Sequence, residues 1–391
     1  MKVFITTRAI YPFHGYGGMG LFYYNLAKHL AEQDIDVEVI TASPTIKENR
    51  ILNKILRSNS MNMNMIKFTF IPYIRRPVLI WNYIYNFYVK KYLVKSMFDI
   101  LHSSGAVGSF PYIYYKKRNP IIAQCIGLEM FRNPANHLDK VYGWLFAYYP
   151  SKAVFNNAEI VAVEGPIQAK EVCMIFGVSR SRIRIIPNGV DIDLIKEYTS
   201  KCNLSREDLN VHDADIVLIN VGRLDKHKGI PYLISALRLL NSMLNVKLIL
   251  IGSGVEKRKI YGLIRKYNLE NKVIHFENIS DRRKFELYKI ADIFVMPTLY
   301  EGLPTVVLEA MAVGLPIVAS NVSEIPTVVR NGINGFLVPP ANPKAIATSI
   351  LKIYDKNLIH IMGRLSRELV RKYDWKLIAK EAIRIYESVL R

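Results

Sequence analysis

The sequence predicts two α/β domains, each built on a doubly wound parallel sheet. Short apolar runs of strand length alternate with longer stretches of helical spacing, which is typical of parallel strands with helices on both faces. The alternation restarts after a polar stretch at residues 202–215, and 391 residues are enough for two or three domains. We therefore expect one domain over residues 1–195 and a second over 196–374, with a ligand cleft between two facing sheets.

The first domain is expected to begin with a strand, a glycine-rich turn and a helix. Residues 2–7 are an apolar run, residues 15–20 include Gly17 and Gly18, and residues 21–33 have helical spacing. Glycine allows a backbone to approach a ligand closely. The turn lacks the full GxGxxG pattern, so it indicates a dinucleotide site only weakly. Further strands are expected at 37–42, 99–104, 120–125, 159–164 and 182–189.

The second domain repeats this organisation. Pro304 fits the first turn of a helix, where its missing N–H costs nothing. We expect the last helix, residues 375–391, to pack back on the first domain. The expected strands are 215–224, 246–254, 272–278, 292–298 and 316–320, and the other expected helices are 229–240, 304–314, 343–354 and 358–372.

The composition limits the partners and the compartment. The formal net charge is +20, which favours an acidic partner: nucleic acid, an anionic membrane surface or a phosphorylated small molecule. The cysteines Cys125, Cys173 and Cys202 form no CxxC pair, so neither a structural zinc site nor a disulfide scaffold is expected. The longest nearly apolar run, 78–89, is shorter than the roughly 20 residues of a membrane span. We expect a cytoplasmic protein that is at most peripheral to a membrane.

The strongest chemical signal is the pair of acids Glu301 and Glu309. Glu301 precedes the expected helix, and Glu309 lies in its second turn. Side chains on a helix lean toward its N-terminus, so both carboxylates can converge there, beside free N–H groups that favour an anion. This combination suits a phosphorylated sugar. The alternative is an ordinary capped helix with an exposed acid at each end.

Arg223 and Lys228 form a second signal, because they follow one expected strand and precede a helix. A guanidinium and a flexible ammonium at the carboxyl end of a strand could hold a diphosphate. The alternative is a solvated loop of basic residues.

Taken together, these segments resemble the retaining glycosyltransferases of family 4, which have the GT-B fold. The resemblance runs nearly from end to end, and its most specific part is ADIFVMPTLYEGLPTVVLEAMAVGLPIVAS at 291–320, followed by NGINGFLVPP at 331–340. The other matching segments are the glycine-rich turn at 15–20, DILHSSG at 99–105, NAEIVAVE at 157–164, IRIIPNGVD at 183–191, VGRLDKHKG at 221–229 and ILIGSG at 249–254.

The resemblance implies transfer of a hexose from a UDP- or GDP-linked sugar to a glycan or a lipid-linked acceptor, with retained anomeric configuration. Glu309 would hold the ribose hydroxyls, and Glu301 would face the hexose near its 3-hydroxyl. Arg223 and Lys228 would neutralise the diphosphate in place of a metal, so no metal or other cofactor is expected. The remaining donor contacts would be the amides of Gly302 and Leu303, the backbone of Gly17 and Gly18, and Ile279 near the base.

The resemblance also implies a mechanism without a carboxylate nucleophile. The acceptor would attack the sugar on the face that the diphosphate leaves, and the departing diphosphate would help to deprotonate it.

The sequence departs from the family pattern on the acceptor side. Ile126 replaces a histidine that family members often carry near the donor sugar, and in DILHSS Ser104 replaces the second of two histidines. His102 remains a candidate catalytic contact; the alternative is a buried core histidine. Two rival functions stay open. One is a catalytically silent sugar-nucleotide or membrane-binding protein, supported by Ile126 alone. The other is a sugar-nucleotide 2-epimerase of the same fold, disfavoured by the block around Glu301 and Glu309.

Residues 50–118 carry much of the positive charge, with twelve Lys or Arg, one acid (Asp99) and fourteen aromatic residues. Aromatic side chains flanked by cations are typical of a helix that lies on an anionic lipid surface. The alternative is a helix whose aromatics pack in the core and whose lysines are solvated. Nucleic acid is not expected as a partner, because no recognised binding module is present. The candidate membrane-binding residues are Arg75, Arg76, Lys90, Lys91 and Lys95.

Overall fold

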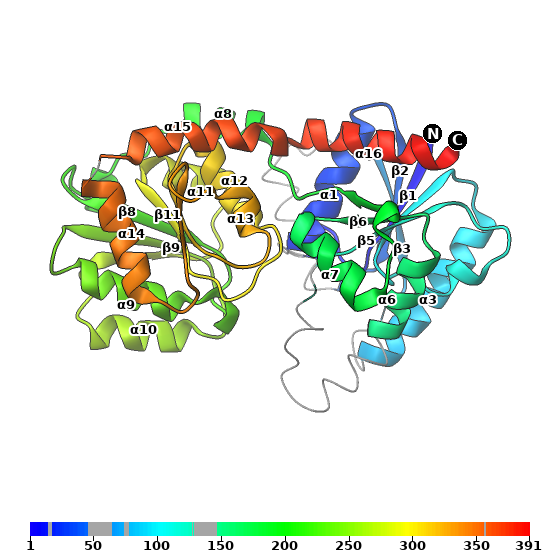
Figure 1. Cartoon of the computed structure of the whole chain (residues 1–391), viewed down its shortest axis with the longest axis horizontal. Coiled ribbons are helices and arrows are strands. Elements are labelled where there is room, and N and C mark those ends of the chain that lie inside the picture. Colours follow the sequence, from blue (N-terminus) through cyan, green and yellow to red (C-terminus); the bar gives the residue numbers. More distant parts are fainter. Residues whose placement is uncertain (15–17, 46–64, 74–77, 127, 129–146, 356) are drawn as a thin grey trace. The chain divides into compact units, whose positions relative to one another are not determined.

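The computed structural model describes residues 1–14, 18–45, 65–73, 78–126, 128, 147–355 and 357–391. The chain divides into two compact units. The first unit comprises Met1–Asn188 and Trp375–Arg391, and the second comprises Gly189–Asp374 (Figure 1). The structure places the boundary between Asn188 and Gly189. The boundary expected after residue 195 lies a few residues further along the chain, inside helix α8 (Ile192–Ser200) of the second unit.

The first unit contains a seven-stranded sheet in the order β3-β2-β1-β4-β5-β6-β7, and all its neighbouring strands pair in parallel. The strand order reverses between β1 and β4, as in a doubly wound fold. Strand β3 was not among the expected strands. The strands are β1 (Lys2–Thr6), β2 (Asp36–Ala42), β3 (Ile66–Ile71), β4 (Ile100–Ser104), β5 (Ile121–Gln124), β6 (Ile160–Val163) and β7 (Ile183–Ile185).

Helices cover both faces of this sheet because its strands are apolar on both faces. Val3 and Ile5 of β1 pack in the core beneath α1 (Gly18–Ala31) and α16 (Trp375–Leu390), whereas Phe4 points to the opposite core. That second layer contains α3 (Val78–Lys95), α6 (Tyr149–Asn157) and α7 (Pro166–Phe176).

Helix α16 packs on the first unit along its whole length, and its buried side chains extend from Trp375 to Tyr386. Trp375 is buried, and its ring lies 5.6 Å from the ring of Phe22 in an edge-on arrangement. Helix α16, drawn in red, therefore lies along α1 although the two are far apart in the sequence (Figure 1).

The second unit contains a six-stranded parallel sheet in the order β10-β9-β8-β11-β12-β13. Its strand order reverses between β8 and β11, and ligands of open α/β sheets bind at such a switch point. The prediction of two doubly wound parallel sheets is confirmed. The strands are β8 (Ile216–Val221), β9 (Val246–Ile251), β10 (Val273–Phe276), β11 (Ile293–Met296), β12 (Ile317–Ser320) and β13 (Gly335–Val338).

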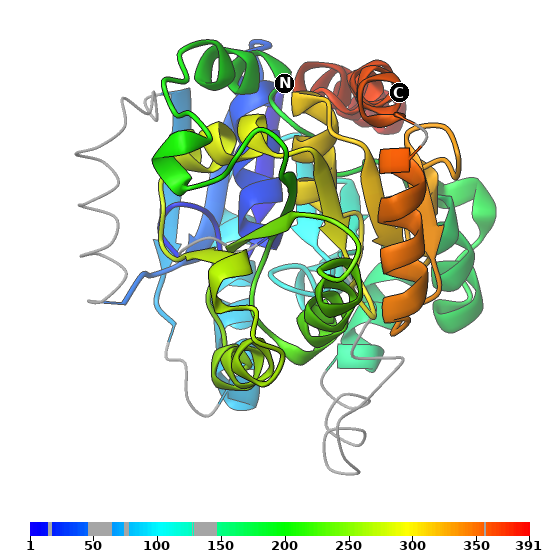
Figure 2. The same ribbon diagram turned by 90° about the vertical axis from the view of Figure 1, so that its left-hand side faces the viewer.

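Alternation along β8 again separates two cores. Ile216 and Leu218 face the layer of α9 (Ile230–Leu240), α10 (Lys257–Lys266) and α14 (Pro343–Asp355). Val217 and Ile219 face the layer that contains α8, α11 and α12. The layer of α9, α10 and α14 can be followed in Figures 1 and 2. The remaining helices of the unit are α11 (Asp281–Ile290), α12 (Thr305–Val313), α13 (Ile325–Val328) and α15 (Ile359–Val370).

Within the described residues, no helix is long and apolar enough to cross a bilayer.

Candidate functional site

Two loops meet at the switch point of the second unit. One follows β8 and ends in the 3-10 turn Lys226–Lys228, and the other follows β11 and leads into α12. The N–H of Leu299 donates to the carbonyl oxygen of His227 at 2.7 Å, and the hydroxyl of Thr298 lies 3.0 Å from the same oxygen. These two bonds hold the loops against each other, so side chains from both strands share one site.

Glycine is required where the loops approach most closely. Gly229 has a φ of +67°, and a Cβ there would lie 2.0 Å from the carbonyl oxygen of Pro297. A side chain at this position would therefore separate the β8 loop from the β11 loop and disrupt the site.

The structure brings Lys228 and Glu301 together as an ion pair across the two loops. Both side chains are only partly exposed, so the pair is more strongly coupled than a surface ion pair. Arg223 pairs with Asp225 at 2.9 Å, but 69% of its side-chain surface is exposed. An exposed ion pair contributes little to stability, and the Arg223 guanidinium keeps N–H donors that can bind a ligand.

Helix α12 begins next to Glu301, and its N-terminus forms part of the same site. Pro304 occupies the N-cap position, where no side chain of the described residues caps the helix. Gly302 and the buried Leu303 precede it. The first N–H groups of a helix lack intrahelical partners and carry partial positive charge. The site thus combines the Lys228–Glu301 ion pair with a helix N-terminus, and Arg223 lies in the same β8 loop as Lys228.

Glu309 lies in the second turn of α12 and is 8% exposed. Its Oε1 accepts a hydrogen bond from the Lys284 ammonium at 2.9 Å, and its Oε2 lies 3.3 Å from the Tyr288 hydroxyl. Burial raises the pKa of Glu309 above its usual value, although the Lys284 ammonium opposes this shift. Burial by itself would lower the pKa of Lys284, but the carboxylates of Glu309 and Asp281 outweigh it and hold this pKa above its usual value. Each of the two expected carboxylates is thus paired with a different lysine.

Sequence reasoning missed Lys284 and Tyr288. They stand four residues apart on α11 and therefore share one face of it. In the run KFELY (284–288), Phe285 and Tyr288 are buried, and Lys284 shares a helix face with Tyr288. A lysine on a helix face that is otherwise buried is the signal that could have identified them.

The other predicted donor contacts are placed as follows. Ile279 lies in the loop between β10 and α11, partly buried against the core beneath α11 and α12. Gly18 is the first residue of α1, and a Cβ there would meet open space. Gly17 lies outside the described residues. The roles of these residues in donor binding stay predictions.

His102 is placed in the core of the first unit. It is 0% exposed on β4, and its Nδ1 lies 2.7 Å from the hydroxyl of Tyr386 on α16. The ring also meets Tyr23 edge-on. Burial lowers the pKa of His102 to about 3. This position agrees with the alternative of a core histidine, and it leaves the ring no exposed surface for contact with a substrate.

Helix α3 divides the basic aromatic stretch into a core face and an exposed face. Tyr85, Val89 and Leu93 are buried, four residues apart in succession. Phe87, four residues before Lys91, is 61% exposed. The core-packing interpretation thus describes the buried face of this helix, and membrane binding by the exposed face stays a prediction.

The exposed face carries further aromatic and basic residues. Tyr83 and Tyr88 are exposed. Of the candidate membrane-binding residues, Lys91 and Lys95 are exposed and Lys90 is half-buried. Arg75 and Arg76 lie outside the described residues. A groove of about 420 Å³ runs beside this face and is lined by Tyr83, Ile84, Phe87, Tyr88, Phe110 and Pro111.

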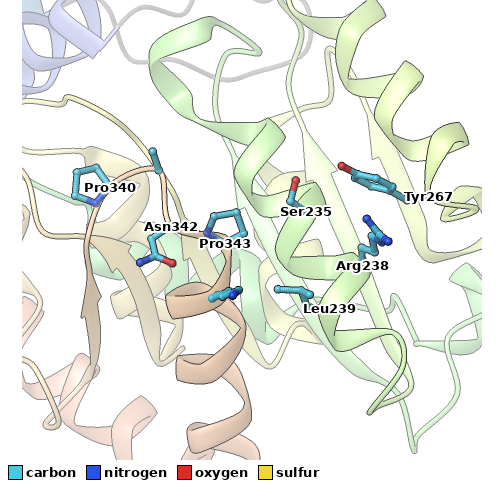
Figure 3. A pocket seen from close by; sticks show the side chains of 9 residues that line it. Ser235, Arg238, Leu239, Tyr267, Pro340, Asn342 and Pro343 are labelled. Atoms are coloured by element: carbon cyan, nitrogen blue, oxygen red, sulfur yellow. The ribbon is translucent and has the colours of Figure 1, made fainter.

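A separate open cavity of about 470 Å³ lies on the α9 and α14 side of the second unit (Figure 3). The Arg238 guanidinium lies over the Tyr267 ring there, 4.9 Å from its centroid. None of the residues predicted from the sequence lines this cavity. Its lining residues are Ser235, Arg238, Leu239, Tyr267, Pro340, Ala341, Asn342, Pro343 and Lys344.

In the part of the chain that the structure describes, no three His, Cys, Asp or Glu side chains are grouped so that they could hold a metal ion.

Two family models match adjoining parts of the chain. Residues 16–194 match Glycosyltransferase Family 4, and residues 203–371 match Glycosyl transferases group 1. The chain belongs to the group 1 glycosyltransferases of family 4. The two matches cover most of both units, including the switch-point loops, Lys284 and Glu309. This glycosyltransferase is therefore assigned by sequence over nearly its whole length.

Relatives and solved structures agree with this assignment. An uncharacterized glycosyltransferase of Methanocaldococcus jannaschii is 26% identical over 100% of this chain and 99% of its own. The UDP-Gal:alpha-D-GlcNAc-diphosphoundecaprenol alpha-1,3-galactosyltransferase of Escherichia coli is 25% identical over 72% of each chain.

Two solved structures share the fold. Sucrose-phosphate synthase of Thermosynechococcus elongatus superposes with a TM-score of 0.81, at 21% identity over 99% of this chain and 98% of its own. Anabaena HepE in complex with UDP-glucose gives 0.75, at 19% identity over 99% and 100%. The glycosyltransferase thus has the GT-B fold.

The burial of His102 predicts a specific loss of stability in acid. The unfolded chain binds a proton at His102 below about pH 6.5, whereas the folded protein does so only near its pKa of about 3. Stability should therefore fall by up to about 1.4 kcal/mol per pH unit through this window because of this residue. Urea unfolding of the wild type and of His102→Gln between pH 7.5 and 4.5 measures it. We expect the stability difference between the two proteins to narrow as the pH falls; parallel curves would contradict a buried neutral histidine.

Proposed function

We propose that this glycosyltransferase transfers a hexose from a UDP- or GDP-linked sugar to a glycan or lipid-linked acceptor, with retention of the anomeric configuration. The observation that carries the proposal is the cluster of Lys228, Arg223 and Glu301 beside the N-terminus of α12, at the switch point of the second unit. Its fold neighbour Anabaena HepE was solved with UDP-glucose. The Escherichia coli relative is named for a UDP-Gal donor and an alpha-D-GlcNAc-diphosphoundecaprenol acceptor.

The charges suit a nucleotide diphosphate sugar. Lys228 has three N–H donors and uses at least one on Glu301, so its other N–H groups can bind diphosphate oxygens. Arg223 and the amides at the start of α12 add donors to the same anion. Glu301 can accept a hydrogen bond from a sugar hydroxyl while it keeps Lys228 in place. Glu309, in the second turn of α12, would accept from the ribose hydroxyls.

The same groups support a retaining transfer. The leaving diphosphate gains negative charge as its bond to the sugar breaks, and preorganised cations and amides stabilise that charge more in the transition state than in the ground state. The acceptor hydroxyl would attack from the face that the diphosphate leaves, and a diphosphate oxygen would take its proton. Lys228, Arg223 and the α12 N-terminus would thus take the place of a metal ion.

The acceptor side of the proposal rests on α3. Its exposed face joins Phe87 and Tyr88 to Lys91 and Lys95, and an aromatic groove lies beside it. Aromatic and basic side chains on one helix face suit the interface of an anionic membrane. We propose that the exposed face of α3 binds the surface of an anionic membrane, so that the protein is a peripheral membrane protein. A lipid-linked acceptor would be exposed at that same membrane surface.

Donor binding should depend on Lys228 and Glu309. Loss of a charge-assisted hydrogen bond costs about 1.5–3 kcal/mol, or roughly 10- to 150-fold in affinity. Calorimetry with the UDP- and GDP-sugars of a donor panel would identify the preferred donor, and Lys228→Ala and Glu309→Ala are then compared with the wild type. Lys201→Ala, a change in an exposed lysine that pairs with Glu197, is the matched control. Unchanged affinity in both site variants would refute the assigned donor site.

Turnover should need no divalent metal. We expect slow release of nucleotide diphosphate from the preferred donor without acceptor, at equal rates with and without excess EDTA. Release that EDTA abolishes and magnesium or manganese restores would contradict the cationic mechanism. Binding without any release would favour the silent sugar-nucleotide binder, and conversion of the donor sugar to its 2-epimer would favour the epimerase.

The α3 surface should bind anionic vesicles in a salt-dependent way. Each Lys or Arg near such a surface contributes about 1 kcal/mol, so Lys90→Gln, Lys91→Gln and Lys95→Gln together should weaken binding by roughly 100-fold. A scattered control removes the same charge through Lys201→Gln, Lys266→Gln and Lys380→Gln. Co-sedimentation at low and high salt compares the three proteins, and donor hydrolysis should survive in all of them. Wild-type protein that stays in the supernatant at low salt would rule out the membrane proposal and favour a soluble acceptor.

A further inference from the structure

The Glu309 carboxylate is held by two side chains of α11, one on each oxygen. The Lys284 ammonium donates to Oε1 at 2.9 Å, and the Tyr288 hydroxyl lies 3.3 Å from Oε2. Each carboxylate oxygen has two lone pairs, so one lone pair on each oxygen is left to accept a further donor. A carboxylate held in this way can accept two hydroxyls that stand side by side.

We propose that Lys284 and Tyr288 are positioning residues of the nucleotide site, which keep the Glu309 carboxylate ionised and oriented to accept the ribose 2′- and 3′-hydroxyls of the donor. The inference rests on the proposed role of Glu309 in donor binding, and it adds the two residues that act through it.

Lys284 supplies the charge that an ionised, buried Glu309 requires. An uncompensated carboxylate in a protein interior is costly and tends to bind a proton instead. The other ionisable group of α11 near this pair is Asp281, which lies 3.1 Å from Lys284 and shares its charge. Tyr198 of α8 lies stacked on Phe285, and Arg367 of α15 bonds to Val313 at the opposite end of α12. Among the described neighbours, Lys284 is thus the cation in direct contact with Glu309.

Tyr288 ties the carboxylate to the backbone of its own helix. Its single hydroxyl proton is shared between two acceptors, the carbonyl oxygen of Val306 at 3.2 Å and Glu309 Oε2 at 3.3 Å, so the hydroxyl links the second turn of α12 to the first. The Tyr288 ring is fully buried, and burial raises the pKa of Tyr288 well above its usual value. The hydroxyl therefore keeps its proton and remains a hydrogen-bond donor.

The test compares a ribonucleotide with its deoxy form. UDP and 2′-deoxy-UDP are titrated by calorimetry into the wild type, Lys284→Met and the control Lys289→Met, whose lysine lies exposed on the same helix. GDP and 2′-deoxy-GDP replace them if GDP binds more tightly. The wild type and the control should prefer the ribonucleotide. In Lys284→Met the affinity for the ribonucleotide should fall about tenfold or more, while the affinity for the deoxynucleotide should fall less.

Two further readouts separate positioning from a merely structural role. The ratio of ribonucleotide to deoxynucleotide affinity should rise between pH 6 and 9 in Lys284→Met, because Glu309 without its cation ionises only at higher pH, and should change less over that range in the wild type. Adding Glu309→Gln to Lys284→Met should cause little additional loss. Tyr288→Phe, which removes one hydroxyl, should lower ribonucleotide affinity several-fold and decides the matter if Lys284→Met does not fold.

The outcomes distinguish the two levels of the proposal. If the wild type shows no preference for the ribonucleotide, the role of Glu309 fails and the inference fails with it. If the wild type shows the preference and both Lys284→Met and Tyr288→Phe keep it in full, the role of Glu309 stands and the positioning role is overturned.

Discussion

The candidate site depends on one constraint, the parallel pairing of β8 with β11. Ile293 and Phe294 of β11 lie in register with Leu218 and Ile219 of β8. Because both strands run in the same direction, their carboxyl ends lie at one edge of the sheet. The loop with Lys228 and the loop with Glu301 must leave the sheet side by side, although 73 residues separate them. The strand pairing already brings the two loops close together. The hydrogen bonds to the His227 carbonyl oxygen and the Lys228–Glu301 ion pair then hold them in place.

The same reasoning explains which parts of the fold could be predicted from the sequence. Central strands such as β8 and β11 are buried on both faces, so they appear as continuous apolar runs of strand length. Two edge strands were not predicted: β3 lies within the basic aromatic stretch, and β13 follows a turn and contains Gly335. The strand at Ile66–Ile71 has only its two end residues buried. The edge strands β7 and β10 are also incompletely buried but were predicted, so incomplete burial weakens the sequence signal of a strand without removing it.

The site shows a similar division. Lys228 and Glu301 could be proposed from the sequence because each lies in the loop that follows a strand, and ligands of parallel sheets bind at such loops. The partnership of Glu309 with Lys284 could not, because it depends on how α11 packs against α12. His102 shows the same limit. Its side chain alternates to the face covered by α16, and a partner 284 residues away in the sequence decides that it is a core residue. Contacts between helices on one face of a sheet carry no local sequence signal.

The ion pairs Lys228–Glu301 and Lys284–Glu309 of the second unit differ in what they can contribute. Lys228 and Glu301 are half-buried and lie at a loop edge, so water can replace either partner when a ligand arrives. The two lysines are equally exposed, at 16% of the side-chain surface, whereas Glu309 is more buried than Glu301, at 11% against 21%. A buried pair of this kind is often no more stabilising than apolar side chains of the same size, because both charges lose their hydration. Leucine and methionine at these two positions would fill the space between α11 and α12 equally well. Stability alone therefore gives little reason for a lysine and a glutamate there, whereas the role proposed for Glu309, as an ionised carboxylate that binds the donor, does.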